Sequence, residues 1–214
     1  ALGILVGAMT TPLMAGSIGI GVSGASAVAG TEGSETLKTT SVVVNAERWT
    51  SVTIPSMYAQ YTFGGGYVIG LDYVPTSAEL GAESVTKNDL QSGDSTTSVT
   101  QKAQAELKNH VMLYAESPAM TALGLYVKAG YSQVTVETNE SLGSGAAYGD
   151  EDVTGVMFGL GFKHEFDNGA LVKLDGLATH YEDISLSSTG SDAATTIKAE
   201  SELYQIKLSL GYNF

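Results

Sequence analysis

Histidines are the residues in this chain with the widest catalytic use. The sequence has 214 residues and contains only three of them, with no cysteine. Three polar residues follow His180 closely: Glu182, Asp183 and Ser185. Serine, histidine and a carboxylate are the components of a hydrolase triad, but such a grouping arises easily by chance and its spacing matches no diagnostic motif. We therefore predict that the protein is not an enzyme, and we keep a membrane-embedded lipid-modifying enzyme as an alternative.

A second chemical pattern consists of charged residues that recur at every second position of several apolar segments. A buried charge without a partner costs on the order of several kcal/mol, so charges that share a narrow interior must pair or be hydrated. If the segments enclose such an interior, we predict a network of ion pairs that plugs it. The alternative is a wet, selective passage for small ions. The predicted lumenal residues are Asp72, Glu106, Lys108, His110, Glu116, Lys128, Lys163, Glu165, Lys173, Asp175 and Lys207.

The composition excludes several functional classes. Hydrophobic residues make up 43% of the chain, which is too many for a disordered protein. Disulfide frameworks and cysteine-based zinc sites cannot form without cysteine. The 10 basic and 23 acidic side chains give a net charge of −13, so this surface would repel phosphates and we predict no nucleic-acid partner.

Most of the acidic excess lies in long stretches rich in serine, threonine and glycine. The run Asp150-Glu151-Asp152 offers oxygen ligands for Ca²⁺ or Mg²⁺, so divalent cations are candidate partners of the acidic stretches. The spacing of an EF-hand is absent, and a solvated loop tip is the simpler interpretation. We predict no metal site and no cofactor, because no P-loop, dinucleotide fingerprint or HExxH motif is present.

The residues between these polar stretches alternate with a period of two, which is typical of strands with one apolar face. No segment after the first residues approaches the length of about 18 apolar residues that a membrane helix needs. We predict eight strands: Ser17–Val22, Ile54–Phe63, Tyr67–Tyr73, Gln104–Glu116, Leu123–Tyr131, Gly155–Phe166, Val172–Thr179 and Tyr204–Phe214. Pro55 has no backbone donor and should lie at a strand end or bulge.

The connections between the expected strands are alternately long and short. This places all short turns at one end of an up-and-down array and all long loops at the other, as in transmembrane barrels. We expect an all-β fold, a closed antiparallel up-and-down transmembrane β-barrel of eight strands. Both termini of the barrel should lie at the short-turn end, because the number of strands is even.

The polar face of the strands alternates charges with glycines, which would suit the crowded interior of a narrow barrel. We therefore expect the apolar face, including Phe158, Leu160, Leu208 and Leu210, to face lipid. Six aromatic residues should form a girdle at the short-turn end: Tyr61, Phe63, Tyr67, Phe166, Tyr212 and Phe214. The alternative is a water-soluble, calycin-like barrel whose apolar face surrounds a ligand cavity.

The last residues, Leu-Ser-Leu-Gly-Tyr-Asn-Phe, resemble the C-terminal assembly signal of bacterial outer-membrane proteins. Its positions in this sequence are Ile206, Leu208, Leu210, Tyr212 and Phe214. The resemblance implies recognition by the barrel-assembly machinery and a location in a Gram-negative outer membrane, in contact with its lipid and lipopolysaccharide. Over residues 16–214 the chain resembles the small OmpA/OmpX-type eight-stranded barrels.

The first residues have a different character. Residues 1–15 are apolar, contain Pro12 and end in small residues, so we expect a signal-peptide remnant there, followed by the barrel domain at 16–214. Eight strands leave an interior that side chains can fill. We predict a structural or surface-interaction role with a largely plugged lumen, and keep a narrow porin-like channel for small solutes or ions as an alternative.

Overall fold

The structure is a computed structural model that describes residues 16–36, 43–91, 95–138, 149–187 and 196–214. The segment expected to be a signal remnant, 1–15, lies outside the described residues. The described chain forms ten strands: β1 (Ser17–Thr36), β2 (Val43–Thr62), β3 (Val68–Tyr73), β4 (Ala78–Gln91), β5 (Ser95–Glu116), β6 (Leu125–Thr138), β7 (Glu151–Glu165), β8 (Ala170–Tyr181), β9 (Ile184–Ser187) and β10 (Thr196–Asn213). Within these ranges no helix has the length and apolar character needed to cross a bilayer.

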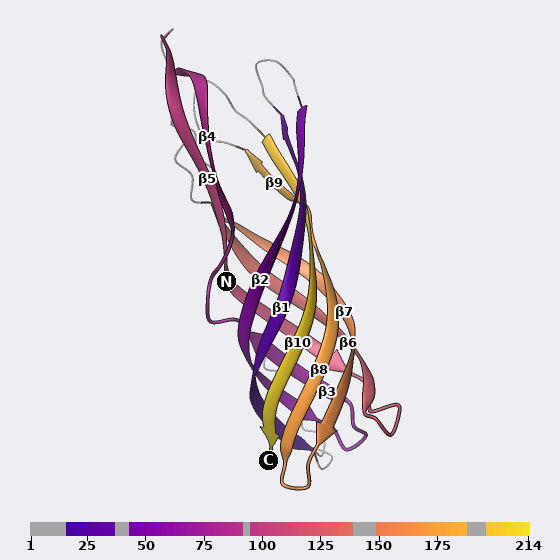
Figure 1. The fold of residues 1–214 in the computed structure, drawn as a ribbon. Coiled ribbons are helices and arrows are strands. Elements are labelled where there is room, and N and C mark those ends of the chain that lie inside the picture. The colour runs from indigo at the N-terminus through magenta and orange to yellow at the C-terminus, as the bar shows by residue number, and fades with distance from the viewer. Residues whose placement is uncertain (1–15, 37–42, 92–94, 139–148, 188–195) are drawn as a thin grey trace, which may run out of the picture.

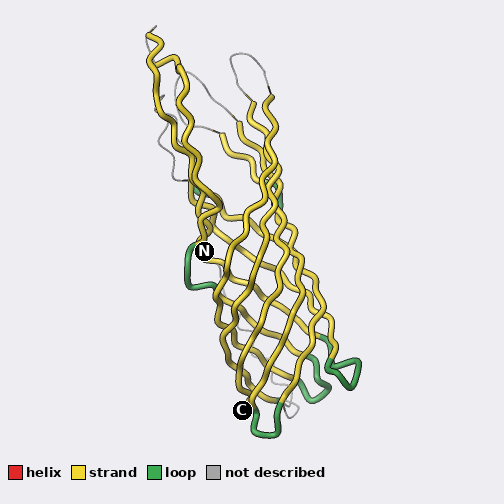
Figure 2. The backbone as a smooth tube through the Cα atoms, viewed as in Figure 1, coloured by secondary structure: helices red, strands yellow, loops and turns green. Residues whose placement is uncertain are grey.

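Eight of the strands form a closed antiparallel barrel. Their order around the wall is β1, β2, β3, β5, β6, β7, β8 and β10, and β10 pairs with β1 from Gly19–Asn213 to Thr36–Thr196 to close it. β4 pairs with β5, and β9 with β10, beyond the ring itself. Figures 1 and 2 show the barrel and these extensions. The prediction of an all-β, eight-stranded, up-and-down barrel is confirmed.

The short connections lie at one end of the barrel, which we call the turn end; the C-terminus lies there too (Figure 1). Three glycines in these connections have positive φ angles: Gly66 (81°), Gly124 (80°) and Gly169 (87°). This backbone region is readily open only to glycine, and it lets the chain reverse within a few residues. The opposite end, which carries the long connections, is called the loop end.

The strands extend further toward the loop end than the sequence predicted. β1 continues to Thr36 and β2 begins at Val43, while β4 and the first half of β5 occupy a stretch expected to be a loop (Figure 1). The expected strands were recognised by an apolar outward face. Beyond the membrane the outer face meets water, so serine, threonine and charged residues fit it equally well and the signal disappears although the strand continues.

The interior has two layers, and the character of the inward side chains changes along each strand. On β10 the inward residues Ser209, Lys207 and Gln205 are polar, whereas the next inward residue toward the loop end is Leu203. An apolar cluster fills the barrel at that level. Its buried members are Ala27, Ala29, Val134, Val136, Val153, Tyr181, Ile184 and Leu203, with Val52, Ile54, Leu107, Leu186 and Ala199 packed against them.

The wall is not paired throughout. β2 pairs with β3 from Thr62–Val68 up to Met57–Tyr73, and among the described residues no strand pairs with β2 on this side beyond Met57. Continuing the same register by two residues would place Pro55 opposite Pro75. Neither proline has an N–H to donate, so the ladder cannot continue through this position. We call the unpaired boundary between β2 and β4 the seam.

The structure thus corrects the expected place of Pro55, which lies inside β2 rather than at its end or at a bulge. The residue is tolerated because β2 remains paired to β1 there, through Gly24. Along an antiparallel strand the backbone groups point alternately to the two neighbours. Phe63 donates its N–H to Tyr67 on the β3 side, so the odd-numbered Pro55 lacks only a donor that would point into the seam.

Candidate functional site

The interior contains pairs of glycine and tyrosine from adjacent strands, three of them in the turn-end half and the Gly155–Tyr181 pair at the level of the apolar cluster. Directly paired residues in the ladders are Gly21–Tyr58, Gly70–Tyr114, Gly161–Tyr126 and Gly155–Tyr181. A Cβ added at Gly70 would stand 2.4 Å from a ring atom of Tyr114. The glycines therefore make room for tyrosine rings inside a narrow barrel, as expected from their alternation with charged residues.

Six charged residues form the centre of the interior and are each at most 5% exposed. We call this set the lumenal network: Asp72, Glu116, Lys128, Lys173, Asp175 and Lys207. Three carboxylates face three ammonium groups, so the set is neutral. Because a buried ion without a partner is strongly unfavourable, the burial of these six groups requires this balance of charge.

Glu116 on β5 is the hub of the lumenal network. Its Oε1 lies 2.7 Å from Lys173 Nζ and 3.4 Å from Lys128 Nζ, and its Oε2 lies 3.5 Å from Lys163 Nζ. Lys128 also stands 4.0 Å from the centre of the Tyr114 ring, close enough for a cation–π contact. Four strands, β5, β6, β7 and β8, are thereby joined through one carboxylate.

Two further carboxylates complete the network. Asp72 accepts a hydrogen bond from Lys207 Nζ at 2.5 Å and another from Ser56 Oγ at 3.3 Å. Asp175 accepts hydrogen bonds from Tyr126 Oη and from Lys128 Nζ. The strands β2, β3 and β10 are joined by the first of these groups, and β6 and β8 by the second.

Polar residues nearer the turn end continue the network toward the opening. Lys173 Nζ donates to Gln60 Oε1 at 2.5 Å, and Asn213 Nδ2 donates to Glu165 Oε2 at 2.8 Å. Glu165 is exposed and Lys163 half-buried, so these two predicted lumenal residues lie at the edge of the lumenal network. Gln60 and Asn213 were not predicted, although their position on the polar face of their strands gave the signal.

The structure places Glu106 and Lys108 outside the lumen, which corrects their prediction. The register of β5 against β6 shifts between Lys108 and Val111, and Asn109 has φ = 54°. Such a bulge inserts one residue and exchanges the two faces of the strand. Beyond it Leu107 turns inward to the apolar cluster, whereas Lys108 pairs with Glu137 at 2.5 Å and with Glu106 at 3.4 Å.

This outer group lies beyond the membrane-spanning part of the barrel. A hydrogen bond from Ser77 and the charge of Lys108 hold the pKa of Glu106 below its ordinary value. The hydrogen bond to Glu137 raises the pKa of Lys108 above its ordinary value. Both shifts favour the charged forms, as expected for an ion-paired group at a water-facing surface.

The three histidines have separate surroundings. His110 lies inside, 3.3 Å from Tyr181 Oη. His164 faces outward at the turn end and packs edge-on against Phe166. His180 is exposed and its Nδ1 lies 3.6 Å from Glu202 Oε1.

The suggested triad components near His180 have other neighbours in the described structure. Glu182 accepts a hydrogen bond from Thr154 Oγ1 at 2.5 Å. Ser185 lies on β9, opposite Lys198. The prediction that the protein is not an enzyme stays a prediction, as do the divalent cations expected at the acidic stretches; among the described residues no group of three or more histidine or acidic side chains is placed to hold a metal ion.

The outer surface carries an apolar band. Phe158 is 66% exposed, Leu160 56%, Leu208 50% and Leu210 52%, so the apolar face points outward as predicted. Apolar side chains exposed in this number around a closed barrel require a lipid environment. Of the aromatic residues expected at the turn end, five are exposed and Tyr61 is half-buried.

A second aromatic group marks the other edge of the band. It was not predicted, although Tyr73, Tyr131 and Tyr204 lie at the ends of expected strands; only Trp49 lies outside them all. Its exposed members are Trp49, Tyr73, Tyr131 and Tyr204. The rings of Trp49 and Tyr204 stack with centroids 6.4 Å apart, and Trp49 lies over Gly30, which leaves space for it. Two aromatic belts are typical of the two membrane–water interfaces.

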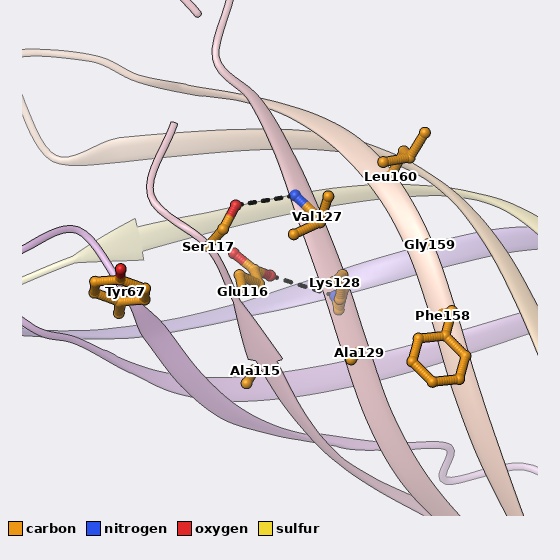
Figure 3. A pocket seen from close by; sticks show the side chains of 10 residues that line it. All are labelled: Tyr67, Ala115, Glu116, Ser117, Val127, Lys128, Ala129, Phe158, Gly159 and Leu160. Carbon is orange, nitrogen blue, oxygen red and sulfur yellow. Dashed lines mark hydrogen bonds and ion pairs between the residues drawn. The ribbon is translucent and has the colours of Figure 1, made fainter. Parts of the chain in front are cut away.

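A groove of about 740 Å³ indents the apolar band toward the turn end. Figure 3 shows its residues on β5, β6 and β7, with Tyr67 at one side. Small residues, Ala115, Ala129 and Gly159, lie beside larger ones such as Phe158 and Leu160. The groove faces the hydrocarbon and lies on the outside of the wall.

The comparisons with known proteins agree with this architecture. The chain is similar to the outer-membrane protein AlkL in lipid bilayers, with a TM-score of 0.55 and 15% identity over 97% of this chain and 94% of AlkL. It also matches OprG from Pseudomonas aeruginosa, with a TM-score of 0.46 and 14% identity over 91% of this chain and 96% of OprG. No protein-family model and no curated protein sequence matches the chain. The protein has the fold of a small bacterial outer-membrane β-barrel, in agreement with the predicted location in the Gram-negative outer membrane.

Proposed function

We propose that the protein is a plugged outer-membrane barrel with a structural and surface-interaction role, exercised at its loop end. One observation carries the proposal: two different layers of buried side chains follow each other along the axis of the interior. The lumenal network places three cations and three anions in the turn-end half, and the apolar cluster lies in the loop-end half. Ions that travelled along the axis would have to break the first layer and cross the second without water.

The loop-end extension supports the surface role. Long strands carry the wall beyond the aromatic group of Trp49 and Tyr204, and their outer face bears carboxylates such as Glu32, Glu47 and Glu200. A packed apolar interior makes this extension a firm support for the connections at its tip. The polar exterior is what a structure standing in water requires.

Recording ionic current across planar bilayers tests the proposal. We expect no steady conductance from the purified protein at any salt concentration. Lys173→Met combined with Glu116→Gln keeps the lumen neutral and should remain closed, because the apolar cluster is untouched. A steady current of porin size from the wild-type protein would show that the lumen is open and would overturn the proposal.

The seam favours a second candidate function, the sideways transfer of small apolar molecules. Val52 and Ile54 lie on β2 beside the seam and pack against the apolar cluster. A molecule admitted among these side chains from the loop end would be stopped by the lumenal network below. Its way out would lead through the seam, close to Tyr73 at the edge of the apolar band. Transfer of an apolar fluorescent probe into vesicles that contain the protein tests this function. It should be lost when Pro55→Thr and Pro75→Thr allow the wall to pair.

A further inference from the structure

We propose that the free edge of β2 binds an extended peptide segment of a partner protein in which apolar and basic residues alternate. The free edge is the row of backbone groups that Glu47, Trp49, Ser51 and Thr53 of β2 direct away from β1. The inference rests on the surface role proposed above and names the class of partner. Its elements are a row of backbone groups, an acidic outer face and an apolar inner face.

The backbone of the free edge is ready to pair. The odd-numbered residues of β2 direct their N–H and C=O groups toward the seam, as Phe63 does in its hydrogen bond to Tyr67. Thr53, Ser51 and Trp49 therefore present donors on a side where, in the described chain, β2 has no ladder partner. A strand edge of this kind is a template for an added strand.

The hairpin of β4 and β5 comes close to β2 but forms no ladder with it in the described chain. β3 and β4 both pair with β5, so β4 would continue β3 alongside β2 if the ladder were unbroken. Figure 1 instead shows β4 and β5 diverging from β2 toward the loop end. The opposed prolines, Pro55 and Pro75, account for the separation. The missing ladder on this side of β2 is thus set by the sequence.

The outer face beside the edge selects a basic partner. Glu47, Glu32 and Glu200 are directly paired across β2, β1 and β10, and Glu202 follows in the next row toward the membrane. These side chains line a hollow of about 130 Å³ with His180 and Trp49. Like charges placed directly opposite each other destabilise a sheet. Lysine or arginine on the outer face of an added strand would offset that repulsion.

On the same outer face, the next row toward the loop end contains a cation, because Lys198 pairs with Ser34 there. The acidic region is therefore bounded, and it lies beside the middle of the free edge. An added strand would need its basic residues near Glu47 and Trp49 rather than at its far end.

The inner face of the edge selects apolar residues at the positions between. Val52 and Ile54 face the interior and pack against the apolar cluster, and Leu107 reaches the same cluster from β5. Side chains of a strand point alternately to its two faces. A strand added to β2 would therefore place every second residue on the inner face, which is apolar at Val52 and Ile54 and polar further toward the loop end, and the others on the outer face beside the carboxylates.

The test uses the full chain in lipid nanodiscs and a fluorescent peptide, as long as the free edge, in which valine and lysine alternate. The control peptide has the same composition in two blocks. We expect the alternating peptide to bind more tightly and to slow amide exchange at Glu47, Trp49, Ser51 and Thr53. Ser51→Pro removes one donor at the edge, as Pro55 already does, and should weaken binding about tenfold. Ser51→Thr is the matched control.

Three results would overturn the inference. One is equal binding of the alternating and block peptides, which would reduce the effect to charge alone. Another is amide exchange in β2 of the wild-type protein that does not change when the alternating peptide is added. This measurement does not depend on the folding of any variant. The third is protection of these amides before any peptide is added, with or without a doubled molar mass, because the edge would then already be occupied. The bilayer recordings report on the plug separately, so a failure of the proposed function is distinguishable from each of these.

Discussion

Each buried tyrosine ring in the turn-end interior has its space because the residue directly opposite on the neighbouring strand is a glycine. Tyr126 lies directly opposite Gly161, and its hydroxyl donates to Asp175. A Cβ at Gly161 would stand 2.2 Å from Asp175 Oδ1 and 2.6 Å from the Tyr126 ring. Both neighbours are buried and paired, so neither can move without disturbing the lumenal network.

Gly161→Ala should therefore lower the free energy of unfolding by about 1–3 kcal/mol, the usual cost of overpacking a filled interior. Urea unfolding in detergent micelles measures this change. Gly24→Ala is the matched control, because a Cβ there meets no atom within 4 Å. Equal effects of the two variants would mean that the interior accommodates the methyl group and that the tyrosine–glycine pairing carries no packing constraint.

A second prediction at this scale concerns the hub of the network. Glu116→Gln removes the carboxylate that faces Lys173, Lys128 and Lys163, and leaves an excess of buried positive charge. The expected loss in the free energy of unfolding is about 3–5 kcal/mol, as for a broken buried pair.

Two comparisons check the origin of that loss. Adding Lys173→Met restores neutrality and should recover part of it. Glu137→Gln breaks the outer pair with Lys108 and should cost about 0–1 kcal/mol, because that pair is partly exposed to water. A loss as large for Glu137→Gln as for Glu116→Gln would contradict the assignment of the network to the interior.

The lumenal residues show what the sequence can and cannot predict. Alternation placed Asp72, Glu116, Lys128 and Lys173 on the inner face, because the period of two is strict where the outer face meets lipid. It failed at Lys108, since one inserted residue at the bulge reverses the faces. Asn109 carries the only local sign, because asparagine is one of the few residues that adopt a positive φ readily.

At the scale of the strands, the seam follows from two prolines at one position of the ladder. Pro55→Thr with Pro75→Thr supplies both missing donors. We expect β2 to pair with β4 across the seam in this variant, so that amide exchange at Thr53 and Ser51 slows. Hydrogen exchange followed by mass spectrometry measures the change. Pro118→Thr, in the turn between β5 and β6, is the control and should leave β2 unaffected. Unchanged exchange in the double variant would show that other contacts hold β4 away.

The strands also show where the sequence loses its signal. The eight expected segments all lie in the barrel wall, because each has an apolar outer face in the membrane. The loop-end continuations were predicted as loops, and there the rule is reversed, with apolar residues such as Val134 and Leu203 inside and charges outside. A search that allowed the apolar face to point either outward or inward would have found the part of β1 beyond Val28. There the inward residues are small and the outward residues are polar.

At the scale of the molecule, charge is divided between the interior and the exterior. The lumenal network is neutral although the chain has a net charge of −13, so the acidic excess lies elsewhere, largely toward the loop end. The apolar band separates the two regions. Its two edges are marked by aromatic residues, and the position of the loop-end edge decides how much of the wall stands in water.

Trp49 is the only tryptophan of the chain and lies at that edge, so it reports on the depth of the barrel in the membrane. In bilayers that contain brominated lipids, we expect its fluorescence to be quenched most by bromines near the headgroups and least by bromines near the chain ends, as for an interfacial aromatic residue. The control variant combines Trp49→Phe with Phe158→Trp, which moves the single tryptophan into the apolar band. Its fluorescence should be quenched by the deeper bromines. Emission from Phe158→Trp that no brominated lipid quenches would mean that the exposed face does not contact acyl chains, and the assignment of lipid to the outside of the barrel would fail with it.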